Sequence, residues 1–205
     1  MKELFKAGCQ HPRHWQFQGK NVYKVNRGYK WLMEGTKIAW DKVIWAKASI
    51  PRHAFISWIF VHHRLPTKVR LNRFLHQNDI LCTMCKGAPE DDVHLLSTCP
   101  YAKEVWDSIL LWWPIPRRCV IFSLEDMLES LVHTPAPKAR KQISSAIYAA
   151  TIYFIWYARN QLLFKNHRVP AQQTVCLIKT QIRQRILFLD SLTCTYSMFV
   201  DGLLT

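Results

Sequence analysis

Four residues of the kinds that bind zinc lie within one short stretch of the 205-residue chain. They are Cys82, Cys85, His94 and Cys99, and their spacing reads C-x2-C-x8-H-x4-C. Zinc in proteins takes about four thiolate or imidazole ligands arranged as a tetrahedron. A C-x2-C turn aims two sulfurs at one point, and we expect Gly87 to supply the positive φ that the turn needs. The stretch therefore predicts a zinc knuckle.

The predicted role of this metal is structural and not catalytic. Three cysteines and one histidine fill a tetrahedral site, so no position is left for a reactive water. Asp91 or Asp92 is expected to cap a short turn that carries His94. Two other interpretations stay open. In the first, the four residues are ordinary core side chains, an interpretation that their polar, acidic loop disfavours. In the second, Cys82 and Cys85 form a redox pair, although no βαβ pattern surrounds them.

The rest of the chain has mostly helical periodicity. Alternating apolar and polar residues around residues 19–21 predict a β-hairpin over residues 15–25. Residue periodicity and proline positions predict helices over residues 38–48, 52–63, 68–76, 100–113, 124–132, 138–166 and from 170 onward, with a short one near Trp31 and Leu32. The expected fold is mainly α: a helical domain with a short N-terminal β-hairpin and a zinc knuckle of three cysteines and one histidine.

Several of these helices carry recognisable caps and apolar faces. Thr67 and Ser123 are the expected N-caps of the helices that follow them. The expected apolar faces are Phe55, Trp58, Ile59 and His62; Ala102, Val105, Trp106, Ile109 and Trp113; and Val175, Ile178, Ile182, Ile186 and Leu189. In the helix over 68–76, the cations Lys68, Arg70 and Arg73 are expected to face outward.

One segment is long and apolar enough to raise the question of a membrane. The 17 residues from Gln142 to Ala158 carry no charge. A length of about 17 residues is the lower limit for a helix that spans a membrane. They also include Ser144, Ser145 and three tyrosines. We interpret the segment as a buried core helix, with a membrane span as the less favoured alternative.

The charge of the chain is strongly positive and unevenly distributed. The formal net charge is +14, with fifteen Lys and Arg against three acids in residues 1–73, and nine against one in residues 138–190. Residues 79–129, which hold the knuckle, carry four Lys and Arg against nine acids. This pattern favours contact with a nucleic acid over a merely solvated basic surface.

The candidate phosphate contacts lie in the two basic blocks. The first set is Lys24, Arg27, Lys30, Arg52, Lys68, Arg70 and Arg73. The second set is Lys138, Arg140, Lys141, Lys179 and Arg183.

No catalytic motif is recognisable, and we expect the chain not to be an enzyme. It contains no GxGxxG, P-loop or GxSxG sequence. The seven cysteines are odd in number and no secretory leader begins the chain, which favours an intracellular location, nuclear or cytoplasmic. A second metal site at Cys9, His11 and His14 would lack a fourth ligand.

Several segments together resemble one known family. They are Trp40-Asp-Lys-Val-Ile-Trp45, Pro51-Arg-His-Ala-Phe-Ile-Ser-Trp58, Arg64-Leu-Pro-Thr67, the Cys82, Cys85, His94 and Cys99 set, Cys99-Pro-Tyr-Ala-Lys-Glu-Val-Trp106, and Ile155-Trp-Tyr-Ala-Arg-Asn160 with Phe164. The chain resembles the zinc-binding domain that follows the polymerase in plant non-LTR (LINE-type) retrotransposon reverse transcriptases. The resemblance spans about residues 14–190.

The resemblance implies a non-catalytic module that contacts RNA template or target DNA, with one structural zinc. Because no polymerase or endonuclease precedes the hairpin, we expect a truncated element copy or a stand-alone derivative. The implied division is a flexible arm (1–13), a reverse-transcriptase-type zinc-binding domain (14–113), a linker and short helix (114–137), a C-terminal basic helical hairpin (138–192) and a tail (193–205).

Two further interpretations belong to other functional classes. The nine tryptophans and the apolar helix over 138–166 are compatible with a protein-interaction or scaffold fragment, whose partner would be a reverse transcriptase polymerase domain. A decayed remnant without a selected function is the remaining alternative. Neither interpretation involves a small-molecule substrate or a membrane.

Overall fold

The computed structural model describes residues 40–75, 79–115 and 123–193. The chain divides into two compact units, residues 1–38 and 39–205, and the described residues all belong to the second. The expected arm, the hairpin over residues 15–25, the short helix near Trp31 and the possible site at Cys9, His11 and His14 lie outside the described residues.

The described part of the chain is helical and contains no sheet, which confirms the mainly α expectation. Its elements are α2 (Asp41–Ile44), α3 (Pro51–Val61), α4 (Lys68–Leu75), the π-helical turn η1 (His94–Thr98), α5 (Pro100–Trp112), α6 (Leu124–His133), α7 (Lys138–Lys165) and α8 (Ala171–Thr193). Only α2 is much shorter than the helix expected over 38–48, of which residues 38 and 39 are not described.

The helix ends follow local sequence chemistry. Pro51 and Pro100 occupy the first turns of α3 and α5, where a missing backbone N–H costs nothing. The predicted cap at Ser123 is confirmed, since its hydroxyl accepts a hydrogen bond from the Asp126 N–H at 3.3 Å. Asn166 ends α7 with a left-handed φ of 51°.

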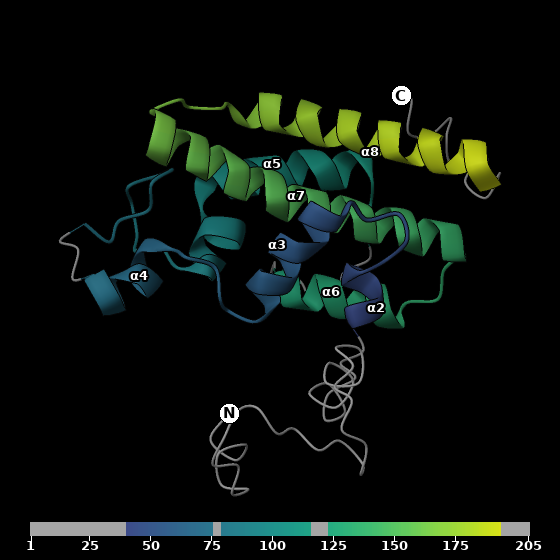
Figure 1. Ribbon diagram of the computed structural model, residues 1–205, viewed down its shortest axis with the longest axis horizontal. Helices are drawn as coiled ribbons and strands as arrows, with labels where there is room; N and C mark the ends of the chain where they lie inside the picture. Colours follow the sequence, from purple (N-terminus) through teal and green to yellow (C-terminus); the bar gives the residue numbers. More distant parts are fainter. Residues whose placement is uncertain (1–39, 76–78, 116–122, 194–205) are drawn as a thin grey trace, which may run out of the picture. The chain divides into compact units, whose positions relative to one another are not determined.

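Helix α7 is the centre around which the described helices pack. It contacts α2, α3, α5, α6, α8 and η1, and it runs antiparallel to α8 at its side (Figure 1). Its middle is buried on almost all sides, as in Ile147, Tyr148 and Ile155, which confirms a core helix. Among the described helices, none has the length and apolar character that crossing a membrane requires.

The expected apolar faces of α5 and α8 are confirmed. In α5 the residues Ala102, Val105, Trp106 and Ile109 are buried, and Trp113 directly after it is also buried. In α8 the buried residues Ile178, Ile182, Ile186 and Leu189 follow one another at helical spacing, and Val175 packs against them partly buried. Both faces lie in one continuous core with α7.

The large apolar face expected for α3 is not the buried one. The buried residues are His53, Ala54, Ser57 and Phe60, while Phe55 is 50% exposed. Small side chains at Ala54 and Ser57 let the α3 backbone approach α7, which is itself rich in buried alanine and serine. Of the expected face, Trp58 and Ile59 still pack partly buried against the core, whereas Phe55 lies on the outer side of α3.

The first backbone N–H groups of helix α4 are satisfied by Glu90. The backbone N–H of Lys68 donates to Glu90 Oε1 at 3.2 Å, and that of Val69 donates to the Glu90 carbonyl at 3.1 Å. Thr67 directly precedes the helix and its carbonyl accepts from the Leu71 N–H at 2.9 Å, while the expected cap by its side chain stays a prediction. The expected outward orientation of Lys68 is wrong. Its side chain is buried, and its ammonium donates to Asp79 at 2.8 Å.

Glu90 joins α4, the knuckle and α7 through one buried ion pair. Arg159 Nη2 lies 2.6 Å and Nε 3.1 Å from Glu90 Oε1, and the Thr83 N–H donates to Oε2 at 2.8 Å. Burial acts to raise the pKa of Glu90, but the hydrogen bonds from Arg159 and Thr83 outweigh it, so the pKa is lowered overall. At neutral pH the pair is therefore fully charged inside the protein.

Breaking this pair should be costly. Glu90→Gln leaves Arg159 without a counter-charge, and we expect the free energy of unfolding at neutral pH to fall by about 3–5 kcal/mol in urea denaturation. Arg159→Met should cost a similar amount, because it leaves the carboxylate alone. The double variant should cost less than the sum, since no unpaired charge remains.

The control is Glu104→Gln, which alters an exposed acceptor of Gln172 on the surface. It should change the free energy of unfolding by no more than about 0.5 kcal/mol. Strictly additive losses in the Glu90 and Arg159 double variant would contradict the proposed coupling.

Candidate metal centre

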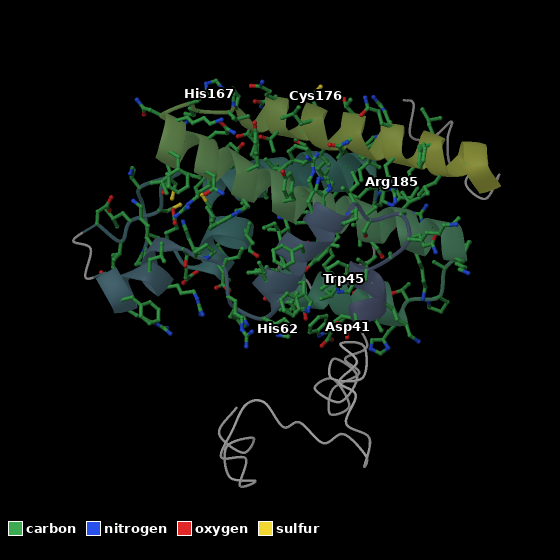
Figure 2. All side chains as sticks on the ribbon, viewed as in Figure 1. Asp41, Trp45, His62, His167, Cys176 and Arg185 are labelled. Atoms are coloured by element: carbon green, nitrogen blue, oxygen red, sulfur yellow. The ribbon has the colours of Figure 1, made fainter. Side chains whose placement is uncertain are left out.

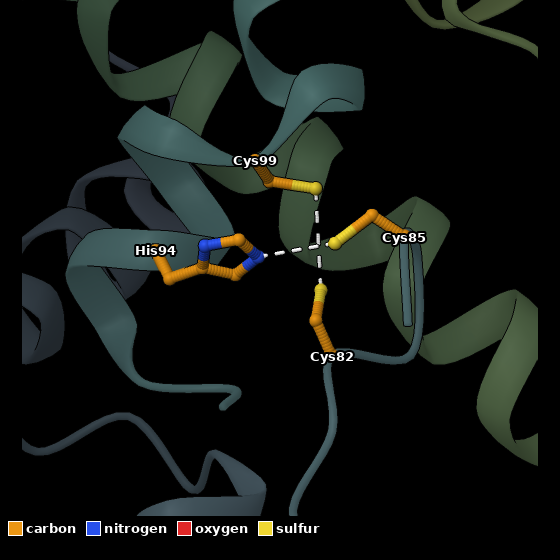
Figure 3. A group of neighbouring side chains, drawn as sticks. All are labelled: Cys82, Cys85, His94 and Cys99. Carbon is orange, nitrogen blue, oxygen red and sulfur yellow. Dashed lines mark hydrogen bonds between the residues drawn. The ribbon is translucent and has the colours of Figure 1, made fainter. Parts of the chain in front are cut away.

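The four predicted metal ligands converge on one point (Figure 3). The donor atoms of Cys82, Cys85, His94 and Cys99 all lie within 4.8 Å of one another, and the group could hold a metal ion. The sulfurs of Cys82 and Cys99 are 4.0 Å apart, and Cys85 Sγ lies 3.2 Å from His94 Nε2. None of the three cysteines is in a disulfide.

These separations fit a tetrahedral zinc site. With zinc–sulfur bonds of about 2.3 Å, two ligand atoms on a tetrahedron are about 3.8 Å apart. The observed 4.0 Å and 3.2 Å lie on either side of that value. Three thiolates and one imidazole also form a ligand set that zinc prefers, and the four together complete its usual coordination number.

The first two ligands are placed by a short, tightly closed loop. A single antiparallel bridge joins Leu81 to Pro89, and the Cys82 N–H donates to the Ala88 carbonyl at 2.7 Å. The chain reverses at Lys86, whose N–H returns to the Cys82 carbonyl at 2.9 Å. The positive φ of 58° belongs to Lys86, so its assignment to Gly87 was wrong.

The other two ligands are placed by the turn η1. Asp91 Oδ1 accepts a hydrogen bond from the His94 N–H at 2.6 Å, which confirms the predicted cap. The Cys99 N–H donates to the His94 carbonyl at 2.7 Å, five residues back, as in a π-helix. Pro100 then starts α5, so Cys99 is both the end of the knuckle and the N-cap of that helix.

A partner outside the ligand set orients the histidine ring. His94 Nδ1 lies 3.3 Å from the Thr98 hydroxyl, which leaves Nε2 directed at the sulfurs. A hydrogen bond at the second ring nitrogen commonly fixes the tautomer of a metal-binding histidine. Because the residue four positions later reaches the ring only when the turn has formed, sequence reasoning did not identify Thr98.

A hydrogen bond between the sulfurs of Cys82 and Cys99 shifts the pKa values of the two thiols in opposite directions. The hydrogen bond from the Cys99 thiol, working against burial and aided by backbone N–H groups, lowers the pKa of Cys82 to about 5. The same bond, followed by burial and the Cys82 charge, raises the pKa of Cys99. In the absence of a cation only one of the two is therefore a thiolate, and a bound metal ion would stabilise the charge of both.

The predicted phosphate contacts are spread over several helices. Arg52, Arg73 and Lys138 are exposed, whereas Arg70, Arg140, Lys141, Lys179 and Arg183 are partly buried and Lys68 is buried. Lys24, Arg27 and Lys30 lie outside the described residues.

Part of the basic set packs on two consecutive tryptophans. Lys179 Nζ lies 5.1 Å and the Arg183 guanidinium 6.0 Å from the ring centre of Trp112. The Arg140 guanidinium lies 4.8 Å from the ring centre of Trp113. Sequence reasoning did not assign the tryptophans this role, because it depends on how α5, α7 and α8 pack.

Comparison with known families agrees with this geometry. Residues 23–106 match the family described as zinc-binding in reverse transcriptase. The matched segment includes all four candidate ligands and the first half of α5. This family is a zinc-binding region and not the catalytic polymerase. No curated protein matches the chain, and no solved structure matches it.

Metal binding should depend on the knuckle cysteines and not on cysteine content in general. Cys85→Ser is expected to weaken Co²⁺ binding and to lower the sulfur-to-cobalt charge-transfer absorption strongly when Co²⁺ is titrated into the metal-free protein, because it removes one of the three thiolate ligands. Cys176→Ser, at an exposed cysteine on α8 (Figure 2), is the matched control and should titrate as the wild type does. Equal absorption from both variants would exclude the assigned ligands.

Proposed function

We propose that the chain is a non-catalytic, zinc-stabilised module that binds nucleic acid. The observation that carries the proposal is the closed set of Cys82, Cys85, His94 and Cys99 within a segment that matches reverse-transcriptase zinc-binding regions. With four protein ligands the metal has no open position, so its task is to hold η1 and the loop before it in place. We propose one zinc per chain.

The zinc proposal has a direct test. Protein purified without chelator should contain about one zinc per chain by elemental analysis, and His94→Ala should contain much less, since three ligands bind zinc far more weakly than four. His133→Ala changes an exposed histidine outside the metal site and should keep its zinc. A wild-type protein free of zinc would overturn the assignment of the metal.

Basic side chains beside the knuckle support the nucleic-acid part of the proposal. A groove of about 250 Å³ is lined by Arg70 and Arg73 of α4, His63, and Asp91 and Asp92 of the knuckle. His63 Nδ1 lies 2.8 Å from Asp92 Oδ2, so the carboxylate of Asp92 already has a hydrogen-bond partner within the protein. The exposed Arg73 is then the best placed cation of this group for a phosphate.

The remaining candidate phosphate contacts differ in how exposed their side chains are and in whether they already donate hydrogen bonds within the protein. Arg52 and Lys138 are exposed, while Lys141 and Arg140 donate to the carbonyls of Val132 and Pro114. We leave Lys68 out of the proposed contact surface because it is buried and paired with Asp79. The preferred nucleic acid would be an RNA template or a DNA target.

We also propose from which group of reverse transcriptases the chain descends. The motifs over residues 38–106 and the Trp156–Asn160 segment support descent from plant LINE-type retrotransposon reverse transcriptases, with a polymerase domain as a possible partner. The structure gives the second motif a physical role, since Arg159 pairs with Glu90 and donates to Asn160 Oδ1 at 2.9 Å. We propose an intracellular location, nuclear or cytoplasmic, for such a module.

Exposed apolar side chains favour a second candidate, a protein-contact fragment. Leu111 is 87% exposed, Phe164 76% and Phe74 73%. If this candidate holds, light scattering should detect a self-associated species that high salt does not dissociate, and no nucleic acid should bind.

Binding of nucleic acid should fall as salt is added, with a slope set by the phosphate contacts. Replacing Arg70 and Arg73 together by glutamine should reduce the slope of log K against log salt for a single-stranded RNA by about 1.4, at about 0.7 per contact. Lys103→Gln is the control, because this exposed cation of α5 neighbours Glu104 and Asp107 in sequence. Fluorescence anisotropy across salt concentrations measures the slope, and absence of binding at low salt would refute the function.

A further inference from the structure

A groove separate from the metal centre is lined by residues of α3, α7 and α8. Its volume is about 340 Å³. Residues from all three helices line it: Arg52, Tyr153, Tyr157, Leu177, Gln181 and Gln184. No part of the zinc knuckle lines this groove, and the features of the sequence that pointed to zinc do not explain it.

Two of the lining residues, Tyr153 and Tyr157, belong to a row of rings that continues beneath the groove to the buried His53. His53 stacks on Tyr153 with ring centres 4.3 Å apart and an interplanar angle of 29°. Tyr157 continues the row, 6.4 Å from Tyr153 at 20°. The inner end is buried at His53 and the outer end is open at Tyr157, which is 37% exposed. The row therefore ends in a partly exposed aromatic ring, that of Tyr157.

The His53 ring adds no charge to this row. Burial, and then the nearby charge of Arg52, lower the pKa of His53 to about 3, so the imidazole is neutral at physiological pH. Both its ring nitrogens lack a protein hydrogen-bond partner. The ring thus packs as an aromatic surface beneath Tyr153.

An arginine lies over the same rings. The Arg52 guanidinium lies 5.3 Å from the ring centre of Tyr153, and its Nη2 donates to Gln181 Oε1 at 2.9 Å. Arg52 is nevertheless an exposed residue. Planar guanidinium groups, like aromatic rings, are surfaces on which unpaired bases stack.

The charge of the groove favours an anionic ligand. Arg52 is the charged residue among those that line it. The three helices that form it carry nine cations, of which Arg159 is paired with Glu90, against one acid, Asp190. Arg185 extends from α8 to the carbonyls of Lys47 and Ala48, beside α3 in the sequence (Figure 2). Aromatic rings beside an exposed arginine, on helices of net positive charge, match a nucleic-acid strand better than an apolar peptide.

We propose that this groove binds unpaired bases of a single-stranded nucleic acid, which stack on Tyr157 and on the Arg52 guanidinium. Thr180 and Gln184 at the groove wall offer hydroxyl and amide groups to the base edges. Bases in a duplex are already stacked on one another and do not reach such a surface. The inference rests on the proposed nucleic-acid function and deepens it by selecting single strands and a location.

The test compares two fluorescein-labelled 12-mers with the same phosphates, an oligouridine and an abasic strand. Wild-type protein should bind the oligouridine at least about tenfold more tightly, because each stacked base contributes about that factor or more. Tyr157→Ala should lose about tenfold for the oligouridine and nothing for the abasic strand. Tyr157→Phe keeps the ring and should bind as the wild type does. Phe164→Ala, at an exposed aromatic residue of α7 outside the groove, is the control and should also bind as the wild type does.

A second readout does not depend on the folding of a variant. Photocrosslinking of the wild type to a strand that carries 5-iodouracil should label Tyr157, as located by mass spectrometry of the digested protein. A crosslink confined to other helices would overturn the location.

The outcomes separate this inference from the function on which it rests. Equal affinity of the wild type for the two strands overturns the base-binding groove but leaves phosphate binding intact. Absence of binding to either strand at low salt overturns both. If Tyr157→Ala binds the oligouridine normally but loses a salt-insensitive self-association, the groove is a protein contact and the inference is wrong.

Discussion

The buried pair of Glu90 and Arg159 is the interaction on which the described structure depends most. Taking two charges out of water costs several kcal/mol for each, and good geometry with complete hydrogen bonding is required to offset it. Here the carboxylate accepts from Arg159, Thr83 and the first N–H of α4. One side chain thereby fixes three elements that are far apart in sequence, with the central helix α7 among them.

This arrangement separates two tasks within the chain. The knuckle is acidic and directs its polar groups inward to the metal ligands and helix caps, as Asp91 does for His94. The basic side chains lie on helices around it, several of them over tryptophan or tyrosine rings. A metal that only holds the chain together is sufficient for such a design, because the surface and not the metal would meet the ligand.

Sequence reasoning succeeded where the decisive information was local. The metal ligands followed from spacing, and the starts of α3, α5 and α6 followed from Pro51, Pro100 and Ser123, since caps and turns involve neighbouring residues. It failed at the buried face of α3 and at Lys68, because both depend on contacts with distant elements. The row of rings from His53 to Tyr157 was beyond sequence reasoning for the same reason: His53 lies about a hundred residues before the two tyrosines.

The start of α4 on Glu90 has a thermodynamic consequence. The helix that carries Arg70 and Arg73 takes its position from a residue of the metal-bearing loop, through the N–H groups of Lys68 and Val69. If metal loss loosens that loop, ion binding and strand binding at α4 become linked equilibria. Linkage is reciprocal, so an occupied phosphate surface would raise the affinity for the ion by the same free energy by which the ion raises the affinity for the strand.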